Sequence, residues 1–442
     1  MRFKILLVIL AFNLSACTNP TDTDPASVDP SKNDEPAGGD PQDAGTSSLD
    51  LTESPAAVAA LESSGARLER NAEGLVTSVD FTNAEISSDV VANLAGVPYV
   101  ENLVLWGPSV NDGVLAQAAK LDRLQSISLE RADITDSGLA HLSSLRHLKK
   151  LNLSRTSLTG AALEHFTGSQ TLTHLYLLRT KVGDAGMGHV GGMSALRLLD
   201  LRDTLVGDSG LAHLRTLTNL VSLKLTGHRI TDAGVVHLDT LVNLRSLSLD
   251  DTQVGDQGLE SIRDLTNLEE LYLFRIQLSD TGMPHLKHLT KLRLLRLRDT
   301  AVSDDGLQHL SAMHDLRVLD LSETNVGDDG LAQLLALDNL EDLNLWYTLV
   351  TDSGLAHVSH MNNLRRLNLD TTGVTDSGLA QLTGMDKLVS LNLSSNQIGD
   401  AGLRHLTGMH KLEELIVKFT LVTTAGAAAL QESIPGINVA RD

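Results

Sequence analysis

Aliphatic residues recur along most of this chain with a period of 24 positions. In the copy at residues 196–217, Leu199 and Leu201 are two positions apart, so both side chains point to one face of a short strand. Three further leucines follow at helical spacing and form one apolar stripe: Leu211, Leu214 and Leu217. Each copy therefore predicts a strand, a turn, a short helix and a second turn.

The copies keep their register without an insertion. A glycine marks the same point of twelve copies: Gly138, Gly186, Gly210, Gly234, Gly258, Gly282, Gly306, Gly330, Gly354, Gly378, Gly402 and Gly426. Val90, Val114 and Ala162 fill the other slots, which gives fifteen copies over residues 76–433. A fixed period of this length indicates a solenoid in which stacked units share one core. Because helices are wider than strands, we expect the stack to curve with its sheet inside.

The repeated unit resembles the bacterial, helix-bearing class of the leucine-rich repeat family. Residues 348–355, Thr-Leu-Val-Thr-Asp-Ser-Gly-Leu, show the motif, and the likeness covers about 360 of the 442 residues. The resemblance implies an α/β fold, a curved right-handed βα superhelix. Its parallel sheet would line the concave face, with short helices on the convex face. It also implies that the concave sheet is the ligand face.

The first residues read as an export signal. Residues 1–16 carry Arg2 and Lys4 before a short apolar run that is too short to span a bilayer. The run ends in Leu-Ser-Ala-Cys17, which resembles the bacterial lipobox. This likeness implies cleavage before Cys17 and lipid attachment to it, against the alternative of an ordinary signal peptide with an incidental cysteine. Thr18, where Asp would indicate inner-membrane retention, slightly favours the outer membrane over the inner or plasma membrane.

Short segments flank the repeats. Residues 17–50 are rich in Asp, Pro, Ser, Thr and Gly, and predict a disordered acidic tether. Residues 51–75 predict a helix that starts at Ser54-Pro55, followed by a hairpin, which together cover one end of the core. Residues 434–442 predict a closing strand at the other end.

Composition excludes several classes of function. The formal net charge is −21, and removal of the signal segment with its two cations makes it −23. Such a surface repels nucleic acid and gains nothing from anionic lipid. The single cysteine, Cys17, excludes an intrachain disulfide. We expect a monomer without a cofactor.

Two polar ladders predict structural roles. An aspartate stands at the start of the helix in twelve copies, and we expect these carboxylates to cap their own helices; they include Asp136, Asp208, Asp232, Asp304 and Asp352. A threonine follows the strand in nine copies, from Thr156 to Thr420, where a hydroxyl can satisfy turn backbone groups.

Two other patterns resemble catalytic or metal sites. Nine histidines occupy one helical position, from His141 to His405, but helices pack ~8–10 Å apart, too far for adjacent residues to share a zinc ion without leaning together. Residues 207–210 spell Gly-Asp-Ser-Gly, as around some serine nucleophiles, yet Asp-Ser-Gly recurs in other copies as part of the repeat. We therefore predict no metal site and no enzyme activity.

Aromatic residues are the best functional signal, since they make up only 3% of the chain and most fall on or beside outward strand positions. Exposed aromatics that gather with arginine mark binding sites. The predicted concave ligand site comprises Trp106, Tyr176, Tyr272, Phe274, Arg296, Arg298, Asp320, Asn344, Trp346 and Tyr347, centred on residues 270–347. The alternative is that these are solvated ladder positions, with Arg296 and Asp320 merely paired.

These features predict a non-catalytic lipoprotein of the cell envelope that binds a protein on its concave face and a membrane through Cys17. Two alternatives remain. Aromatic platforms with Asp, Asn and Arg also suit a glycan or the cell wall, and a third possibility is a structural spacer of the envelope.

Overall fold

The computed structural model describes residues 52–442; the signal segment, the tether and Cys17 lie outside the described residues. The strands are β1 (Arg67–Arg70), β2 (Val76–Asp80), β3 (Asn102–Val104), β4 (Ser126–Ser128), β5 (Lys150–Asn152), β6 (His174–Tyr176), β7 (Leu198–Leu201), β8 (Ser222–Leu225), β9 (Ser246–Ser248), β10 (Glu270–Tyr272), β11 (Leu294–Arg296), β12 (Val318–Asp320), β13 (Asp342–Asn344), β14 (Arg366–Asn368), β15 (Ser390–Asn392), β16 (Glu414–Ile416) and β17 (Asn438–Ala440).

The α-helices alternate with these strands: α1 (Pro55–Ser63), α2 (Ser88–Ala92), α3 (Asp112–Ala118), α4 (Asp136–Leu139), α5 (Asp184–Val190), α6 (Asp208–Leu211), α7 (Asp232–Val235), α8 (Asp256–Glu260), α9 (Asp304–Leu307), α10 (Asp328–Gln333), α11 (Asp352–Val358), α12 (Asp376–Leu379), α13 (Asp400–Leu403) and α14 (Thr424–Ser433). Short 3₁₀ helices extend or replace them: η3 (Asn93–Gly96), η4 (Ala140–Ser144), η5 (Gly160–Phe166), η6 (Ala212–Thr216), η7 (Val236–Leu238), η8 (Met283–Leu286), η9 (Gln308–Leu310), η10 (Ala380–Leu382) and η11 (Arg404–Leu406).

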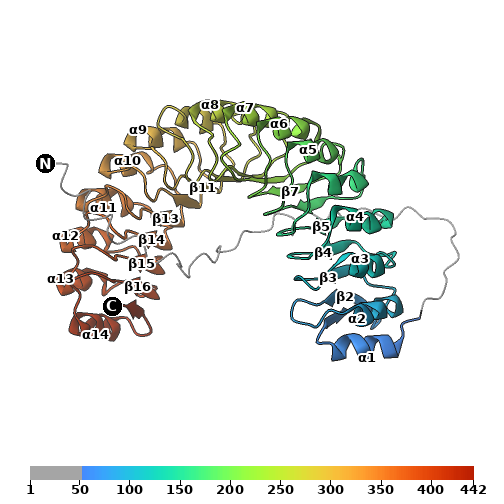
Figure 1. Ribbon diagram of the computed structural model, residues 1–442. Helices are drawn as coiled ribbons and strands as arrows, with labels where there is room; N and C mark the ends of the chain where they lie inside the picture. Colours follow the sequence, from blue (N-terminus) through green and yellow to red (C-terminus); the bar gives the residue numbers. More distant parts are fainter. Residues whose placement is uncertain (1–51) are drawn as a thin grey trace, which may run out of the picture. The chain divides into compact units, whose positions relative to one another are not determined.

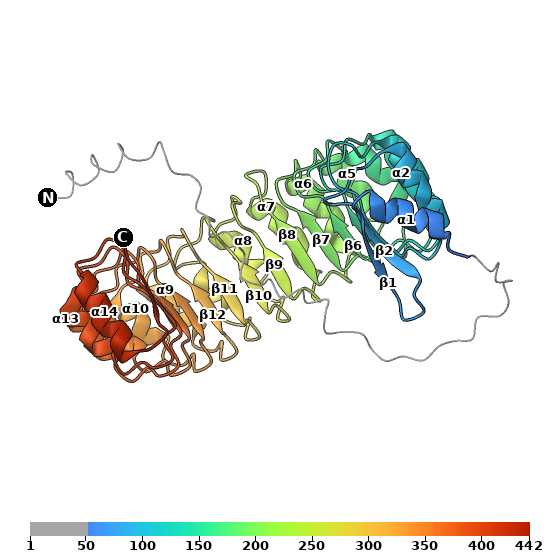
Figure 2. The same cartoon turned by 90° about the horizontal axis from the view of Figure 1, so that it is seen from below.

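The strands of residues 52–442 form one sheet of 17 strands. β1 pairs with β2 antiparallel, and every later strand pairs with the next one in parallel, as β10 does with β11 and β16 with β17. Figures 1 and 2 show these strands along the inner side of an arc and the helices along its outer side. The predicted leucine-rich repeat solenoid, with its sheet on the concave face, is therefore confirmed.

One apolar core runs through the whole described unit. The leucines of each copy, such as Leu199 and Leu211, are fully buried, and one cluster of buried residues extends from Leu61 to Ile437. At one end α1 and the β1–β2 hairpin cover this core, and at the other end α14 and β17 do so. No helix of residues 52–442 is both long enough and apolar enough to cross a membrane.

Each copy leaves its strand through the same turn. The residue after the outward position has a left-handed backbone in twelve copies where it is not glycine, for example Asp251 with φ 56° and Arg275 with φ 53°. The next residue is usually threonine, and its hydroxyl donates to the carbonyl of the last strand leucine, as Thr252 Oγ1 does to Leu249 at 2.7 Å. All nine ladder threonines donate to the carbonyl three residues earlier, which belongs to Val417 in the last copy and to a leucine in the others: Thr156, Thr180, Thr204, Thr252, Thr300, Thr324, Thr348, Thr372 and Thr420.

The aspartate ladder has a different role from the predicted one. Asp136, Asp208, Asp232, Asp304 and Asp352 are the first residues of their helices, and the capping position belongs to the residue before each of them. Their carboxylates instead accept a backbone N–H of the following copy, as Asp232 Oδ1 does from Gly255 at 2.6 Å. Where that residue is Thr or Ser, its hydroxyl donates to the second oxygen, as Thr231 does to Asp208. The ladder is therefore a clamp between copies.

The glycine that recurs in twelve copies packs against the aspartate of the preceding copy. A Cβ on Gly258 would lie 2.5 Å from Asp232 Oδ1 and 2.7 Å from Val254 Cγ1. The same conflict with the preceding aspartate occurs at Gly210, Gly306 and Gly402. The clamp oxygen occupies the space that any side chain here would need, which explains why glycine recurs one copy after aspartate.

Replacing Gly258 by alanine is expected to lower the free energy of unfolding by about 1–3 kcal/mol, because the Asp232 carboxylate must leave the Gly255 N–H. Helix propensity alone predicts the opposite, a gain of about 1 kcal/mol. Gly408→Ala is the matched control, since nothing lies within 4 Å of its added Cβ. Urea unfolding of both variants measures the difference; equal stability of the two would contradict the clamp.

Candidate ligand-binding site on the concave sheet

Four predicted site residues form one row across four adjacent strands. Tyr272 of β10 is the register partner of Arg296 of β11, Arg296 is the partner of Asp320 of β12, and Asp320 is the partner of Asn344 of β13. Because parallel strands lie ~4.8 Å apart, the row spans about 14 Å. The sheet therefore brings these side chains together on its concave side.

A second row lies two residues further along each copy and is built around Arg298. Its guanidinium carbon lies 5.0 Å from the ring centroid of Phe274 and 5.0 Å from that of Trp346. Its Nε donates to Glu323 Oε1 at 2.8 Å. Two rings thus hold one guanidinium between them, an arrangement stabilised by the attraction of a cation to aromatic faces. Phe274, Arg298 and Trp346 are all half-buried, so one side of the stack stays accessible.

Neighbouring residues fix the first row in a similar way. The guanidinium carbon of Arg296 lies 5.3 Å from the ring centroid of Tyr272. The Tyr272 hydroxyl donates to Glu270 Oε2 at 3.2 Å, and Ser246 Oγ donates to the same oxygen at 2.9 Å. The aromatic faces are therefore held in place before a ligand arrives, which lowers the entropy cost of binding.

Two carboxylates lie partly beneath these rows. Burial raises the pKa of Asp320, while hydrogen bonds from the Ser322 hydroxyl and N–H and the charges of Arg296 and Arg298 oppose that rise. Burial also raises the pKa of Asp250, which accepts the Phe274 N–H at 2.8 Å. Both side chains fix the turns that carry the second row and supply negative charge beneath the arginines. Acidic side chains therefore lie among the cations and rings as well, since Glu323 pairs with Arg298, and Asp251 and Asp299 pair with Arg275.

Asn344 has the same local role as Asp320. Its Oδ1 accepts the N–H of Trp346 at 3.1 Å and so fixes the turn that presents the indole ring. The Asp320 carboxylate does the same for the Ser322 N–H at 3.0 Å. Asn344 and Asp320, which the sequence predicted as ligand contacts, therefore also stabilise the turns of their own copies.

Two predicted members lie elsewhere on the sheet. Trp106 occupies the same position of its copy as Phe274 does, but it stands seven copies away, roughly 34 Å at the strand spacing. The guanidinium carbon of Arg131 lies 5.4 Å from the ring centroid of Trp106. Tyr176 of β6 stands four copies from Tyr272, roughly 19 Å. The structure does not bring either ring to the patch around Arg298, so the predicted site separates into distant parts.

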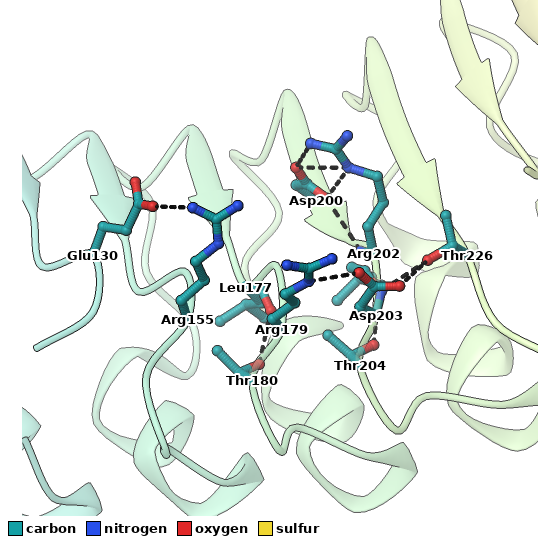
Figure 3. A network of polar contacts seen from close by, with 11 residues as sticks. Glu130, Arg155, Leu177, Arg179, Thr180, Asp200, Arg202, Asp203, Thr204 and Thr226 are labelled. Carbon is teal, nitrogen blue, oxygen red and sulfur yellow. Dashed lines mark hydrogen bonds and ion pairs between the residues drawn. The ribbon is translucent and has the colours of Figure 1, made fainter. Parts of the chain in front are cut away.

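The copies between Trp106 and Tyr272 carry charged side chains that pair with each other. Figure 3 shows Arg155 bonded to Glu130 at 2.8 Å, Arg179 bonded to Asp203 at 2.9 Å, and Arg202 bonded to Asp200 at 2.7 Å. Most of these groups are partly exposed, so each pair adds little stability. This stretch carries Tyr176 and paired charges, in place of the stacked rings and guanidinium of the Arg298 patch.

Tyr347 differs from the prediction in its position. It does not lie on the strand face but at the left-handed turn beyond it, with φ 55°, and 55% of its surface is exposed. Its ring centroid lies 6.5 Å from that of Trp346, with an interplanar angle of 55°. Tyr347 therefore borders the concave patch at the edge where the strands end.

Sequence reasoning missed two residues of the patch. The guanidinium carbon of Arg275 lies 4.4 Å from the Phe274 centroid, and Arg275 also pairs with Asp251 at 3.0 Å and with Asp299 at 3.1 Å. Glu323 is the second missed residue, and its carboxylate accepts the Nε–H of Arg298. Both stand at the left-handed position of their copies, which the sequence marks only by its fixed offset from the strand leucines.

The described residues hold no candidate metal site, and a shallow hollow lies at the edge of the sheet where the strands begin. No group of three His, Cys, Asp or Glu within residues 52–442 is placed to hold a metal ion. One shallow hollow of about 690 Å³ lies near the starts of β13 to β16, where Arg365, Lys387 and Lys411 alternate with Glu341 and Glu413. It contains no aromatic residue and lies away from Arg298.

Comparison with known proteins agrees with this architecture. The family described as leucine-rich repeat region matches residues 159–433, which is more than half of the chain. The chain belongs to the leucine-rich repeat family, whose repeats are non-catalytic binding scaffolds. No curated protein matches the sequence.

Solved structures with the same fold include one protein from Listeria monocytogenes and one from Arabidopsis. An internalin from Listeria monocytogenes is 23% identical, with a TM-score of 0.60 over 73% of this chain and 87% of the internalin. The ectodomain of the Arabidopsis receptor kinase HAESA, solved with an N-terminally extended IDA peptide hormone as its ligand, is 16% identical. Its TM-score is 0.51 over 85% of this chain and 71% of the ectodomain. At these identities the likeness concerns the fold.

Proposed function

We propose that this chain is a lipid-anchored scaffold of the bacterial cell envelope that binds a protein or peptide on its concave face. The patch comprises Tyr272, Phe274, Arg296, Arg298 and Trp346. The observation that carries the proposal is the Arg298 guanidinium, held between the half-buried rings of Phe274 and Trp346. Arginine and aromatic side chains that are rigid and accessible make up the hot spots of protein interfaces.

Electrostatics defines the kind of ligand that suits the patch. Arg296 and Arg298 lie beside the rings of the patch, where Glu323 pairs with Arg298 and Asp320 lies close to both arginines. A polypeptide that presents a carboxylate beside an apolar side chain would gain from both the cations and the rings. The HAESA ectodomain, solved with a peptide hormone on the same fold, supplies one precedent.

The anchor is the second part of the proposal. Cys17 follows the lipobox-like Leu-Ser-Ala, and a cysteine that carries two or more acyl chains holds a protein stably at a membrane. The acidic residues 17–50 would then keep the repeats away from the membrane surface. We place the protein at the outer membrane in preference to the inner one, because Thr18 stands where Asp would indicate retention.

The test of ligand binding is photocrosslinking in the native envelope. A benzophenone side chain replaces Arg275, a rim position whose counterparts Tyr347 and Phe419 already carry aromatic rings on the same backbone. The control replaces Gln308, an exposed residue of η9 on the opposite face. We expect a discrete polypeptide adduct from position 275 and none from position 308. A glycan adduct, or no adduct at position 275, would contradict a protein ligand.

A further inference from the structure

The edge of the sheet where the strands end changes character abruptly along the arc. At the left-handed position of each copy, the residues from Arg131 to Glu323 are charged in eight of nine cases: Arg131, Arg155, Arg179, Asp203, Asp251, Arg275, Asp299 and Glu323. The next four copies carry Tyr347, Thr371, Ser395 and Phe419. Charge therefore disappears from this ladder at the copy that also carries Trp346.

The ladder two residues further on is already uncharged from Gln253 onward, so both ladders lack charge in the last four copies. Its last four members are Leu349, Gly373, Gln397 and Leu421, whereas earlier copies carry Lys181 and Arg229 there. We call the eight residues of these two ladders the uncharged edge: Tyr347, Leu349, Thr371, Gly373, Ser395, Gln397, Phe419 and Leu421. The strip runs over four copies without a charged side chain in either ladder.

Large apolar side chains stand exposed at both ends of this strip. Leu349 is 64% exposed, Phe419 74% and Leu421 72%. Residues 347–351 read Tyr-Thr-Leu-Val-Thr and residues 419–423 read Phe-Thr-Leu-Val-Thr, so one end nearly repeats the other three copies later. The two aromatic–leucine pairs are therefore about 14 Å apart at the strand spacing, with small or uncharged polar side chains between them.

The backbone conformation at Tyr347 and Phe419 is unusual for aromatic residues. Tyr347 and Phe419 have φ 55°, a left-handed conformation that bulky side chains rarely adopt. Asp and Gly, which tolerate it better, occupy the same position in other copies. Two exposed aromatic rings at a position where other copies carry charged or small residues indicate a function outside the fold itself.

The strip is also a rigid surface. Its backbone is bonded to neighbouring copies at every step: Tyr347 donates to Asp370 at 3.0 Å, Thr371 to Ser394 at 3.0 Å and Ser395 to Lys418 at 2.8 Å. The second ladder does the same, with Gly373 donating to Val350 at 2.8 Å and Leu421 donating to Ile398 at 2.8 Å. A partner would thus meet apolar groups that are already held in place, which lowers the entropy cost of docking.

We infer that the uncharged edge binds an uncharged polypeptide segment that places apolar side chains at both aromatic–leucine pairs. The polar groups between the pairs, on Thr371, Ser395 and Gln397, suit the hydrogen bonds of a peptide backbone. A lipid bilayer would offer the Gln397 amide no hydrogen-bond partner and would bury the Asp370 carboxylate that accepts the Thr371 hydroxyl, at a cost. A second copy of this chain would bring another net charge of −21 close to the first. None of the eight side chains of the uncharged edge could pair with a charged segment, which would lose solvation there; the carboxylates beside the strip, Asp370 and Asp442, already accept hydrogen bonds from Thr371 and Phe419.

The test uses a phage-displayed library of random linear peptides selected against the full chain. The edge variant combines Leu349→Gln, Phe419→Ser and Leu421→Gln, which are the residues that other copies of this chain carry at the same positions, as in Gln397 and Ser395. Leu205→Gln is the matched control, since Leu205 belongs to the same ladder, is 47% exposed and follows a charged turn residue. Thermal unfolding of each variant checks that the fold is kept.

We expect selected peptides that are rich in apolar residues and poor in charged ones. They should bind the wild type and Leu205→Gln equally and the edge variant roughly tenfold more weakly or worse. They should also bind a chain with Tyr272, Phe274 and Trp346 replaced by alanine as well as the wild type, which separates this surface from the concave patch.

Other outcomes overturn the inference. These are failure to select any peptide, enrichment of charged peptides, or equal binding to the edge variant. Sedimentation tests for a second copy as the occupant: a wild-type dimer that the edge variant converts to a monomer would replace the proposed partner. Phosphatidylcholine vesicles test for a membrane as the occupant: if the wild type binds vesicles and the edge variant does not, a lipid surface would replace the proposed peptide.

Discussion

Joint replacement of Tyr272, Phe274 and Trp346 by alanine is expected to weaken binding of the crosslinked ligand by roughly 100-fold, since a few aromatic residues carry most of the binding energy in such interfaces. The rings lie on the concave surface and outside the leucine core. The midpoint of thermal unfolding should therefore shift by no more than a few degrees. Affinity measured by titration, with thermal unfolding as the check, gives the result.

The other concave aromatics provide the matched control for this variant. Trp106→Ala and Tyr176→Ala remove rings from the same face at roughly 34 Å and 19 Å from the patch, and each should leave the affinity unchanged. Similar losses in the control variants would mean that the ligand covers the whole concave face. An affinity that survives the triple replacement would place the ligand elsewhere.

Replacing Cys17 by alanine in the full-length precursor is expected to abolish fatty-acid labelling and to move the protein out of the membrane fraction. The reason is chemical, since the proposed lipid would be attached through the Cys17 thiol. Metabolic labelling with palmitate and fractionation of the envelope measure both effects.

Thr18→Ala serves as the control for the anchor, since it leaves Leu-Ser-Ala-Cys intact and should keep the label. Label that persists in the Cys17 variant would contradict the lipoprotein proposal. Loss of label without release from the membrane fraction would show that another contact retains the protein there.

The sequence predicts the fold well because the period expresses the geometry of one repeated unit. The spacing of Leu199 and Leu201 defines a strand, and the absence of insertions defines which residues become neighbours in adjacent copies. The pairing of Tyr272 with Arg296 and of Arg296 with Asp320 follows from that register alone. The row of four side chains across β10 to β13 could therefore be predicted before any coordinates.

Two features could not be obtained in this way. The period does not say whether an aspartate faces the N-terminus of its own helix or the turn of the next copy, because that depends on the stagger between copies. The signal that Asp232 lies against Gly258 was the recurrence of glycine one copy after aspartate. The left-handed turn that moves Tyr347 off the strand face is a backbone property, and it is hidden where Arg, Asp and Tyr occupy a position that usually favours Gly or Asn.

The clamp between copies has a consequence for how such a protein can change over evolutionary time. Asp208 meets Thr231, Asp232 meets Gly255, and Asp256 meets Ser279 with the same backbone contact, so the modules that carry this aspartate offer their successors the same joint. A gene duplication or deletion of one whole module would rejoin matching ends and lengthen or shorten the arc by a single step. The reach of the protein is therefore adjustable in increments of 24 residues, while a shift by any other length would misalign every joint that follows.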